Sequence, residues 1–213
     1  AIAAAVLGSV LCASAFAQQA EEGSWMVRAR AVHLDSSNGD STGLGLSIND
    51  KWLPEFDVTY FYNKNLAVEL ILTVPQKQTL SSNGAAIGSF KHLPPTLTLQ
   101  YHFDAQGFKP YVGAGINYTR LSAVHLPAGV TVDRNSFGPA LQVGVDIPVA
   151  KNMYLNFDVK KVYIRTDVSA AGAKIGRFKV DPMLVGVGLG WCGGRLPDAP
   201  VIPGMPSPVL FDG

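Results

Sequence analysis

Apolar and polar residues alternate with a period of two in eight segments of this 213-residue chain. Because successive side chains of a β-strand point to opposite faces, this period predicts strands that each have one apolar face. In the segment 66–74, for example, Leu66, Val68 and Leu70 fall on one face and Glu69 falls on the other. The predicted strands are 24–34, 52–62, 66–74, 95–103, 110–120, 136–149, 152–166 and 178–191.

The connections between these segments alternate in length. Residues 63–65, 104–108 and 150–151 are short connections, whereas 35–51, 75–88, 122–135 and 167–176 are long ones. Short periplasmic turns, long extracellular loops and an even number of strands are typical of bacterial outer-membrane barrels. We therefore predict an all-β fold: an eight-stranded antiparallel up-and-down transmembrane β-barrel with short periplasmic turns and longer extracellular loops. Both ends of the barrel sequence then lie on the periplasmic side.

The polar face of the strands distinguishes a membrane barrel from a soluble one. Charged residues make up 15% of the chain, against about 25% in average soluble proteins. On the polar faces the charges are sparse, of both signs and mixed with Gly, Thr, Asn and Gln, which suits a narrow lumen. Unpaired charges in a confined interior are costly, so we expect Arg28 and Arg30 to pair with carboxylates of the next two strands.

Strand parity, that is, whether a residue falls on the apolar or the polar face of its alternating strand, predicts a set of residues that line the lumen. They are Arg28, Arg30, Glu55, Asp57, Glu69, Ile71, Gln142, Asp158 and Lys160. Our hypothesis is that Ile71 and nearby small residues form the narrow apolar part of a path, while the charged residues close it to ions. Ordinary interior packing is the alternative explanation of the same pattern.

Aromatic residues collect near the ends of the predicted strands. Trp and Tyr favour the two membrane interfaces, where the ring lies in hydrocarbon and its polar edge is hydrated. The predicted interface aromatics are Trp25, Trp52, Tyr62, Tyr101, Tyr118 and Trp191, and we expect Phe178 near the extracellular rim as well. Aromatic residues that only filled a core would be scattered through the strand middles.

Both ends of the chain differ in composition from the barrel segments. Residues 1–17 are uncharged and apolar and close with Ala15-Phe16-Ala17, which predicts a cleaved secretory signal peptide with a truncated basic region. Cleavage removes Cys12 and leaves Cys192 without a disulfide partner. The five prolines after Gly194 predict a disordered tail. We therefore divide the chain into a signal peptide (1–17), a barrel (18–191) and a Pro-rich tail (192–213).

Net charge and motifs narrow the possible classes of function. The formal net charge is +1 and no concentrated stripe of Lys and Arg occurs, so nucleic acid is not an expected partner. The four His residues lie outside any recognisable hydrolase motif, so we expect neither an enzyme nor a bound cofactor or metal. A soluble lipocalin-like carrier of a hydrophobic ligand is the main alternative, because Gly23-Ser24-Trp25 matches the start of that family.

Several segments resemble the OmpW family of outer-membrane proteins. They are LPPTL at 93–97, KPYVGAGINY at 109–118, QVGVD at 142–146, NLAVEL at 65–70 and KVDP at 179–182. The resemblance spans residues 23–191 and implies an eight-stranded barrel in the outer membrane of a Gram-negative cell. It further implies a narrow, largely hydrophobic channel that passes small apolar compounds, with a lateral opening in the wall.

The resemblance also implies which molecules contact the protein. Outer-membrane lipid surrounds the barrel, small hydrophobic molecules pass through it, and the outer-membrane barrel assembly machinery inserts it. Members of the family usually end on an aromatic residue at the close of the last strand, where this machinery reads it. Here the chain continues past Trp191, so Trp191 is the candidate for that terminal aromatic.

Overall fold

Eight strands close into one antiparallel ring in the computed structural model, which describes residues 23–126 and 129–193. The ring consists of β1 (Trp25–Asp35), β4 (Lys51–Phe61), β5 (Leu66–Thr73), β8 (Thr96–His102), β9 (Lys109–His125), β11 (Asn135–Ala150), β12 (Met153–Val162) and β15 (Met183–Gly193). Each of these strands pairs with the next, and β15 pairs back with β1. The predicted fold class, an eight-stranded up-and-down antiparallel barrel, is confirmed.

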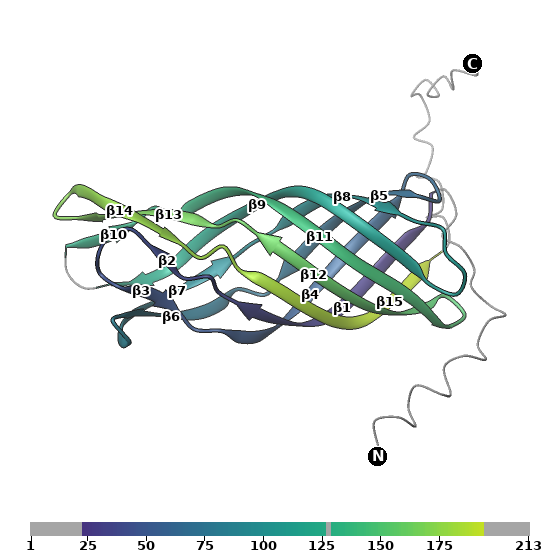
Figure 1. Cartoon of the computed structure of the whole chain (residues 1–213), viewed down its shortest axis with the longest axis horizontal. Helices are drawn as coiled ribbons and strands as arrows, with labels where there is room; N and C mark the ends of the chain where they lie inside the picture. The colour runs from purple at the N-terminus through teal and green to yellow at the C-terminus, as the bar shows by residue number, and fades with distance from the viewer. Residues whose placement is uncertain (1–22, 127–128, 194–213) are drawn as a thin grey trace, which may run out of the picture.

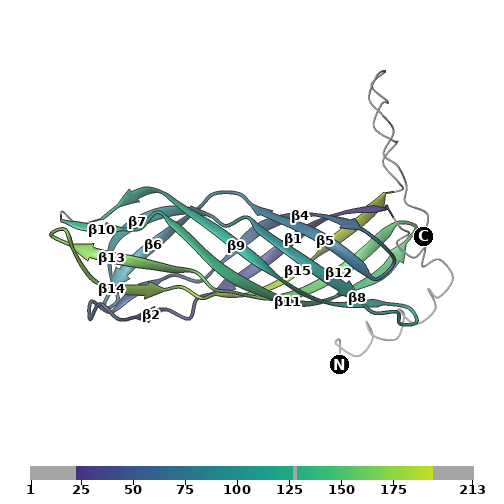
Figure 2. The same ribbon diagram turned by 90° about the horizontal axis from the view of Figure 1, so that it is seen from above.

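The barrel is long and narrow in both views (Figures 1 and 2). The start of β1 and the end of β15 lie at one end of it, together with the short turns β4–β5, β8–β9 and β11–β12 (Figure 1). We call this end the periplasmic end, because outer-membrane barrels have their short turns there, and the opposite end the extracellular end.

The long connections extend the wall of the barrel instead of forming irregular loops. They contain β2 (Gly39–Asp40), β3 (Leu46–Ile48), β6 (Gln76–Ser82), β7 (Ala85–Leu93), β10 (Val130–Val132), β13 (Arg165–Ala170) and β14 (Ala173–Lys179). Asn83 and Gly84, between β6 and β7, have φ values of 48° and 83°. Two successive positive φ angles fit the type I′ turn that joins the strands of a tight hairpin, so the predicted loop at 75–88 is largely a β-hairpin.

Two predicted strands are interrupted, which corrects the ranges 152–166 and 178–191. The chain bends at Asp181, which has a φ of 34°, and at Pro182, which has no N–H to donate to a ladder. The Asp181 carboxylate accepts a hydrogen bond of 3.0 Å from the backbone N–H of Ile164, in the matching break between β12 and β13. Phe178 is also corrected, because it is buried inside the barrel and not at the outer rim.

The polarity of the two faces of the wall is the reverse of that in a soluble protein, because apolar side chains face outward and charged ones face inward. Leu97 and Val143 face outward and are 46% and 54% exposed, whereas Arg28 and Glu69 face inward and are both 0% exposed. A continuous apolar outer surface around a charged interior is the arrangement that a hydrocarbon solvent requires. The lipocalin-like alternative needs the opposite arrangement, with apolar side chains inside.

Some predictions concern residues outside the described part of the chain. The signal peptide at 1–17 and most of the Pro-rich tail lie there, whereas Cys192 and Gly193 belong to β15. In residues 23–126 and 129–193, no helix combines the length and the apolar character needed to span a bilayer.

A charge on the outer face tests the orientation of the wall. We expect Val143→Arg to destabilise the barrel by about 2–4 kcal/mol, because mid-strand outward positions lie near the centre of the bilayer. Val149→Arg, in the same outward row but beside the β11–β12 turn, is the matched control and should cost about 0–1 kcal/mol. Denaturant unfolding in lipid vesicles measures both, and equal costs would contradict a membrane-facing wall.

Candidate functional site

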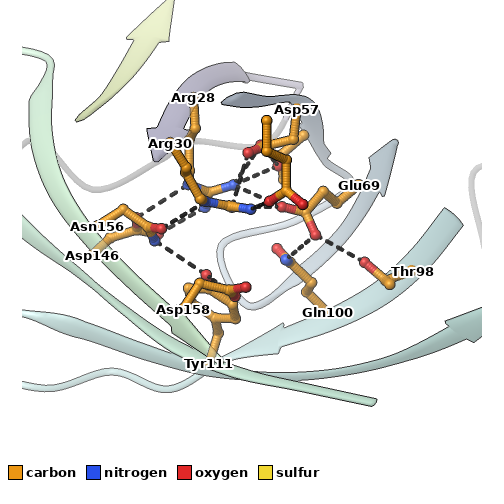
Figure 3. A network of polar contacts seen from close by, with 12 residues as sticks. Arg28, Arg30, Asp57, Glu69, Thr98, Gln100, Tyr111, Asp146, Asn156 and Asp158 are labelled. Atoms are coloured by element: carbon orange, nitrogen blue, oxygen red, sulfur yellow. Dashed lines mark hydrogen bonds and ion pairs between the residues drawn. The ribbon is translucent and has the colours of Figure 1, made fainter. Parts of the chain in front are cut away.

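Arg28 of β1 crosses the lumen and binds carboxylates on both sides of it (Figure 3). Its Nε and Nη2 donate to the two oxygens of Asp146 on β11, at 3.1 and 2.7 Å. Its Nη1 donates to Asp57 on β4 at 3.0 Å and to Thr59 at 2.7 Å. A bidentate Arg–carboxylate pair has strict geometry, so this side chain is held as a strut between β1 and β11.

Arg30 repeats the arrangement one step nearer to the extracellular end. Its Nη1 donates to Glu55 at 2.8 Å, its Nη2 lies 2.8 Å from Asp57 Oδ2, and Nη2 also donates to Glu69 at 2.9 Å. Lys160 of β12 reaches the same Glu55 carboxylate at 2.6 Å. The ion pairs that the sequence predicts between Arg28 or Arg30 and the carboxylates of the next two strands are therefore present.

Two further carboxylate oxygens of the network accept hydrogen bonds from neutral donors. Glu69 Oε2 accepts from Gln100 at 2.8 Å and from Thr98 at 3.0 Å. Asp158 Oδ2 accepts from Tyr111, which lies beside it in Figure 3, at 2.8 Å. The same oxygen accepts from Gln142 at 2.7 Å. Buried charges are tolerated when they are paired and hydrogen-bonded, which is the case here.

We call this network the ionic plug. It comprises Arg28, Arg30, Lys160, Glu55, Asp57, Glu69, Asp146 and Asp158, and each of the eight is at most 3% exposed. Seven of the eight ring strands supply its charged or neutral members, whereas β15 presents glycines toward it. A Cβ on Gly190 would lie 3.1 Å from Arg28 Cγ, so this glycine leaves room for the arginine stem. The plug contains three cations and five carboxylates, a formal excess of two negative charges.

An apolar chamber lies between the plug and the extracellular end. Its lining includes Leu46, Leu80, Phe90, Leu121, Ile164 and Phe178, which the extracellular extensions and the upper parts of the ring strands provide. The hydroxyl groups at its edge bond to the wall: Thr119 donates to Asn117 at 2.6 Å, and Thr166 donates to the Asp133 carbonyl at 2.8 Å. The free space is about 40 Å³, so an organic guest needs side chains here to move apart.

A smaller cavity of about 20 Å³ lies between the chamber and the plug. Glu55 and Lys160 line it from the plug side, and Ile71 lines it from β5. Ile71 is the one apolar member of the predicted lumen set, and it is 2% exposed. The structure thus places all nine predicted lumen residues inside the barrel, with Ile71 at the boundary between its polar and apolar parts.

In the wall beside this cavity, two neighbouring segments are not paired with each other, although Leu72 and Thr73 pair with β4 and Leu93 pairs with β9. The β5–β8 ladder ends at the pair Ile71 and Thr96, and pairing resumes at Gln76 and His92 in the β6–β7 hairpin. The intervening segments, 72–75 and 93–95, contain three prolines, which have no N–H to donate. We call these two segments the proline seam. Thr73 and Pro94, from its two sides, both line the small cavity.

The predicted set of lumen residues left out several members of the network, although their strand positions place them on the inward face. Asp146, Asn156, Tyr111 and Gln100 are buried and bonded in it but were not predicted as lumen residues. Tyr111 shares the parity of Gly113 and Gly115, and a Cβ on Gly144 would lie 2.4 Å from its ring. An aromatic residue in register with a glycine of the neighbouring strand, and in the same row as Gly113 and Gly115, is the sequence signal that could have identified it.

The predicted interface aromatics lie on the outer face. Trp52, Tyr62, Tyr101 and Trp191 are between 48% and 68% exposed. Trp25 packs against Tyr60 near the periplasmic end in a tilted pair, with ring centroids 4.8 Å apart, and Tyr118 packs against Phe137 in the same way near the extracellular end at 4.7 Å. No group of three or more His, Cys, Asp or Glu side chains in the described ranges is arranged to hold a metal ion.

Known proteins are similar to this chain in sequence. The sequence model of the OmpW family matches residues 19–192. An uncharacterized outer-membrane protein, y4mB, of Sinorhizobium fredii is 41% identical over 179 residues, which cover 78% of each chain. The dibenzothiophene metabolism operon protein PahQ of Pseudomonas aeruginosa is 30% identical over 188 residues, or 80% of this chain and 89% of that protein.

The fold is also that of a solved outer-membrane protein. OprG of Pseudomonas aeruginosa superposes with a TM-score of 0.71 at 22% identity, over 81% of this chain and 97% of its own. Together with the outward apolar wall, these matches place the barrel in the bacterial outer membrane. The chain belongs to the OmpW family of outer-membrane β-barrels.

Proposed function

We propose that this barrel passes small apolar compounds from the extracellular side into the hydrophobic part of the outer membrane. Such compounds enter the apolar chamber and leave sideways through the proline seam. The observation that carries this proposal is the position of the plug: it fills the lumen directly below two cavities, the lower of which touches the seam. The protein acts by binding and release, without catalysis.

The lateral route follows from the cost of the axial one. An apolar molecule that continued along the axis would have to separate ion pairs such as Arg28–Asp146 in a site that water does not reach. Breaking a buried pair costs about 3–5 kcal/mol, and the plug contains several. At the seam, by contrast, no backbone ladder has to break, and Leu72 and Val74 on its outer side are each 44% exposed toward lipid.

The name of one relative supports small apolar compounds as the class of substrate. One relative is named for an operon of dibenzothiophene metabolism, and dibenzothiophene is a flat, uncharged, apolar molecule. The chamber is lined mainly by aliphatic and aromatic side chains, and its edge hydroxyls Thr119 and Thr166 already bond to the wall. Such a lining favours uncharged apolar guests and gives no compensation for the desolvation of an ion.

The plug predicts that the barrel does not conduct ions. We expect planar-bilayer recordings to show no steady current for the unmodified protein. The double variant Arg28→Ala/Arg30→Ala should give a current that prefers cations, because it removes two struts and leaves five carboxylates in the lumen. Lys64→Ala/Lys151→Ala removes equal charge from periplasmic turns as the control. A large steady current through the unmodified protein would contradict a closed lumen.

The cavity beside Ile71 predicts that a charge at this position reduces uptake of apolar compounds. Ile71→Asp places a carboxylate in the small apolar cavity, so we expect uptake of dibenzothiophene by whole cells to fall severalfold. Thr79→Asp, which adds the same charge on the exposed side of β6, should leave uptake unchanged. Surface levels of both variants are compared by heat-modifiable gel migration. Unchanged uptake in Ile71→Asp would remove this residue from the path.

The seam is tested by restoring its backbone donors. Pro94→Val/Pro95→Val supplies two N–H groups and two residues that favour strands, so we expect the ladder to extend and uptake of dibenzothiophene to fall severalfold. Pro110→Val/Pro139→Val makes the same change where β9 and β11 are already paired, and it should have little effect. Normal uptake in the first variant would show that the exit lies elsewhere, while the assignment of the chamber would stand.

A further inference from the structure

Three cations on the outer face of the extracellular extension have no ion-pair partner among residues 23–126 and 129–193. Lys77 of β6 and Lys91 of β7 are directly opposite each other in the hairpin register. Arg120 of β9 is opposite Leu93, two residues along from Lys91, so it is the diagonal neighbour of Lys91. All three are exposed, whereas the adjacent Gln78, His92 and Leu121 are buried, which shows that the three share the outward face.

This arrangement is unfavourable for the protein alone. Like charges directly opposite on one face of an antiparallel pair are destabilising. No Asp or Glu occurs in β6, β7 or β9, and within the described part of the chain none of the three side chains forms an ion pair or a side-chain hydrogen bond. The chain also pairs Arg165 with Lys179 across β13 and β14, but there Asp181 lies 3.4 Å from the guanidinium. At the Lys77–Lys91 pair, no carboxylate of the described residues neutralises the two charges, so an anion from outside the protein fits there.

The position of the cluster along the wall indicates the source of that anion. Arg120 follows Tyr118 by two residues, which is about 7 Å along a strand. Tyr118 and Phe137 form the aromatic pair at the extracellular interface, and Phe137 is 75% exposed. Below them the wall is apolar, with Ile116 at 61% and Leu97 at 46% exposed. The three cations therefore lie at the level of lipid headgroups, above a surface that acyl chains can cover.

We propose that Lys77, Lys91 and Arg120 bind a phosphate group of lipid A, the phosphorylated glycolipid of the outer leaflet, whose acyl chains then lie along the wall below Tyr118. The Arg120 guanidinium can donate two parallel hydrogen bonds to one phosphate, and the two ammonium groups neutralise its charge. The bound headgroup lies beside the proline seam, because Lys77 follows Pro75 and Lys91 precedes Pro94 within three residues. The binding does not depend on the proposed transport.

The test uses the full chain purified in detergent, with Lys77→Gln/Lys91→Gln/Arg120→Gln as the variant. Lys64→Gln/Lys151→Gln/Lys174→Gln, at exposed positions away from the cluster, is the control with the same change in net charge. Native mass spectrometry measures the binding of bisphosphorylated and dephosphorylated lipid A. We expect the variant to bind bisphosphorylated lipid A at least tenfold more weakly, since each cation near an anionic surface contributes roughly a factor of five.

Thermal midpoints from heat-modifiable gel migration separate binding from folding. Without lipid the variant should be as stable as the unmodified protein or more so, because the Lys–Lys repulsion is gone, but bisphosphorylated lipid A should raise only the midpoints of the unmodified protein and the control. If the variant does not fold, Arg120→Gln alone is used. Equal binding by the variant, equal losses in variant and control, equal binding of dephosphorylated lipid A, or an equal midpoint rise with inorganic phosphate would each overturn the proposal.

Discussion

The narrow lumen of an eight-stranded barrel sets the constraint on which the rest of this structure depends. Side chains must fill that space, and any charge among them must find its partners there, because neither lipid nor bulk water can supply them. Arg28 meets this condition with a bidentate bond to Asp146 across the lumen and a bond to Asp57 beside it. The neighbouring strand, β15, contributes small residues such as Gly190, which pairs with Arg28, since a second large side chain would occupy the same volume.

The plug also divides the interior into regions of opposite polarity. Toward the periplasm, Met26, Phe61, Tyr154 and Cys192 pack beneath it, and toward the outside the lining becomes aliphatic and aromatic. The extracellular region is enclosed by the paired extensions of the strands, which continue the wall of the barrel. In such a barrel, the chamber is a region that apolar molecules can enter, and the ionic plug is a region that excludes them. The weak point in the wall, the proline seam, lies at the boundary between them.

The alternation of residues carried most of the information about the fold. It identified all eight ring strands, because a strand with one face in lipid and the other in a polar lumen has the clearest period-two signal. It also selected Arg28, Arg30 and the carboxylates opposite them, since their parity is opposite to that of the apolar row. The signal failed in the extensions: around Phe178 and Leu121 the inward face becomes apolar while the outward face becomes charged, so parity there assigns the wrong side.

The sequence by itself determined the number of strands, their direction and the face that meets lipid, because each of these depends on local period and on the lengths of neighbouring connections. Only the tertiary structure decided which charges meet. Arg28 and Asp146 are 118 residues apart, and their contact depends on how the ring closes and how its strands are staggered. The chamber likewise exists only when distant strands come together, because closure energies and registers between distant strands leave no local pattern in the chain.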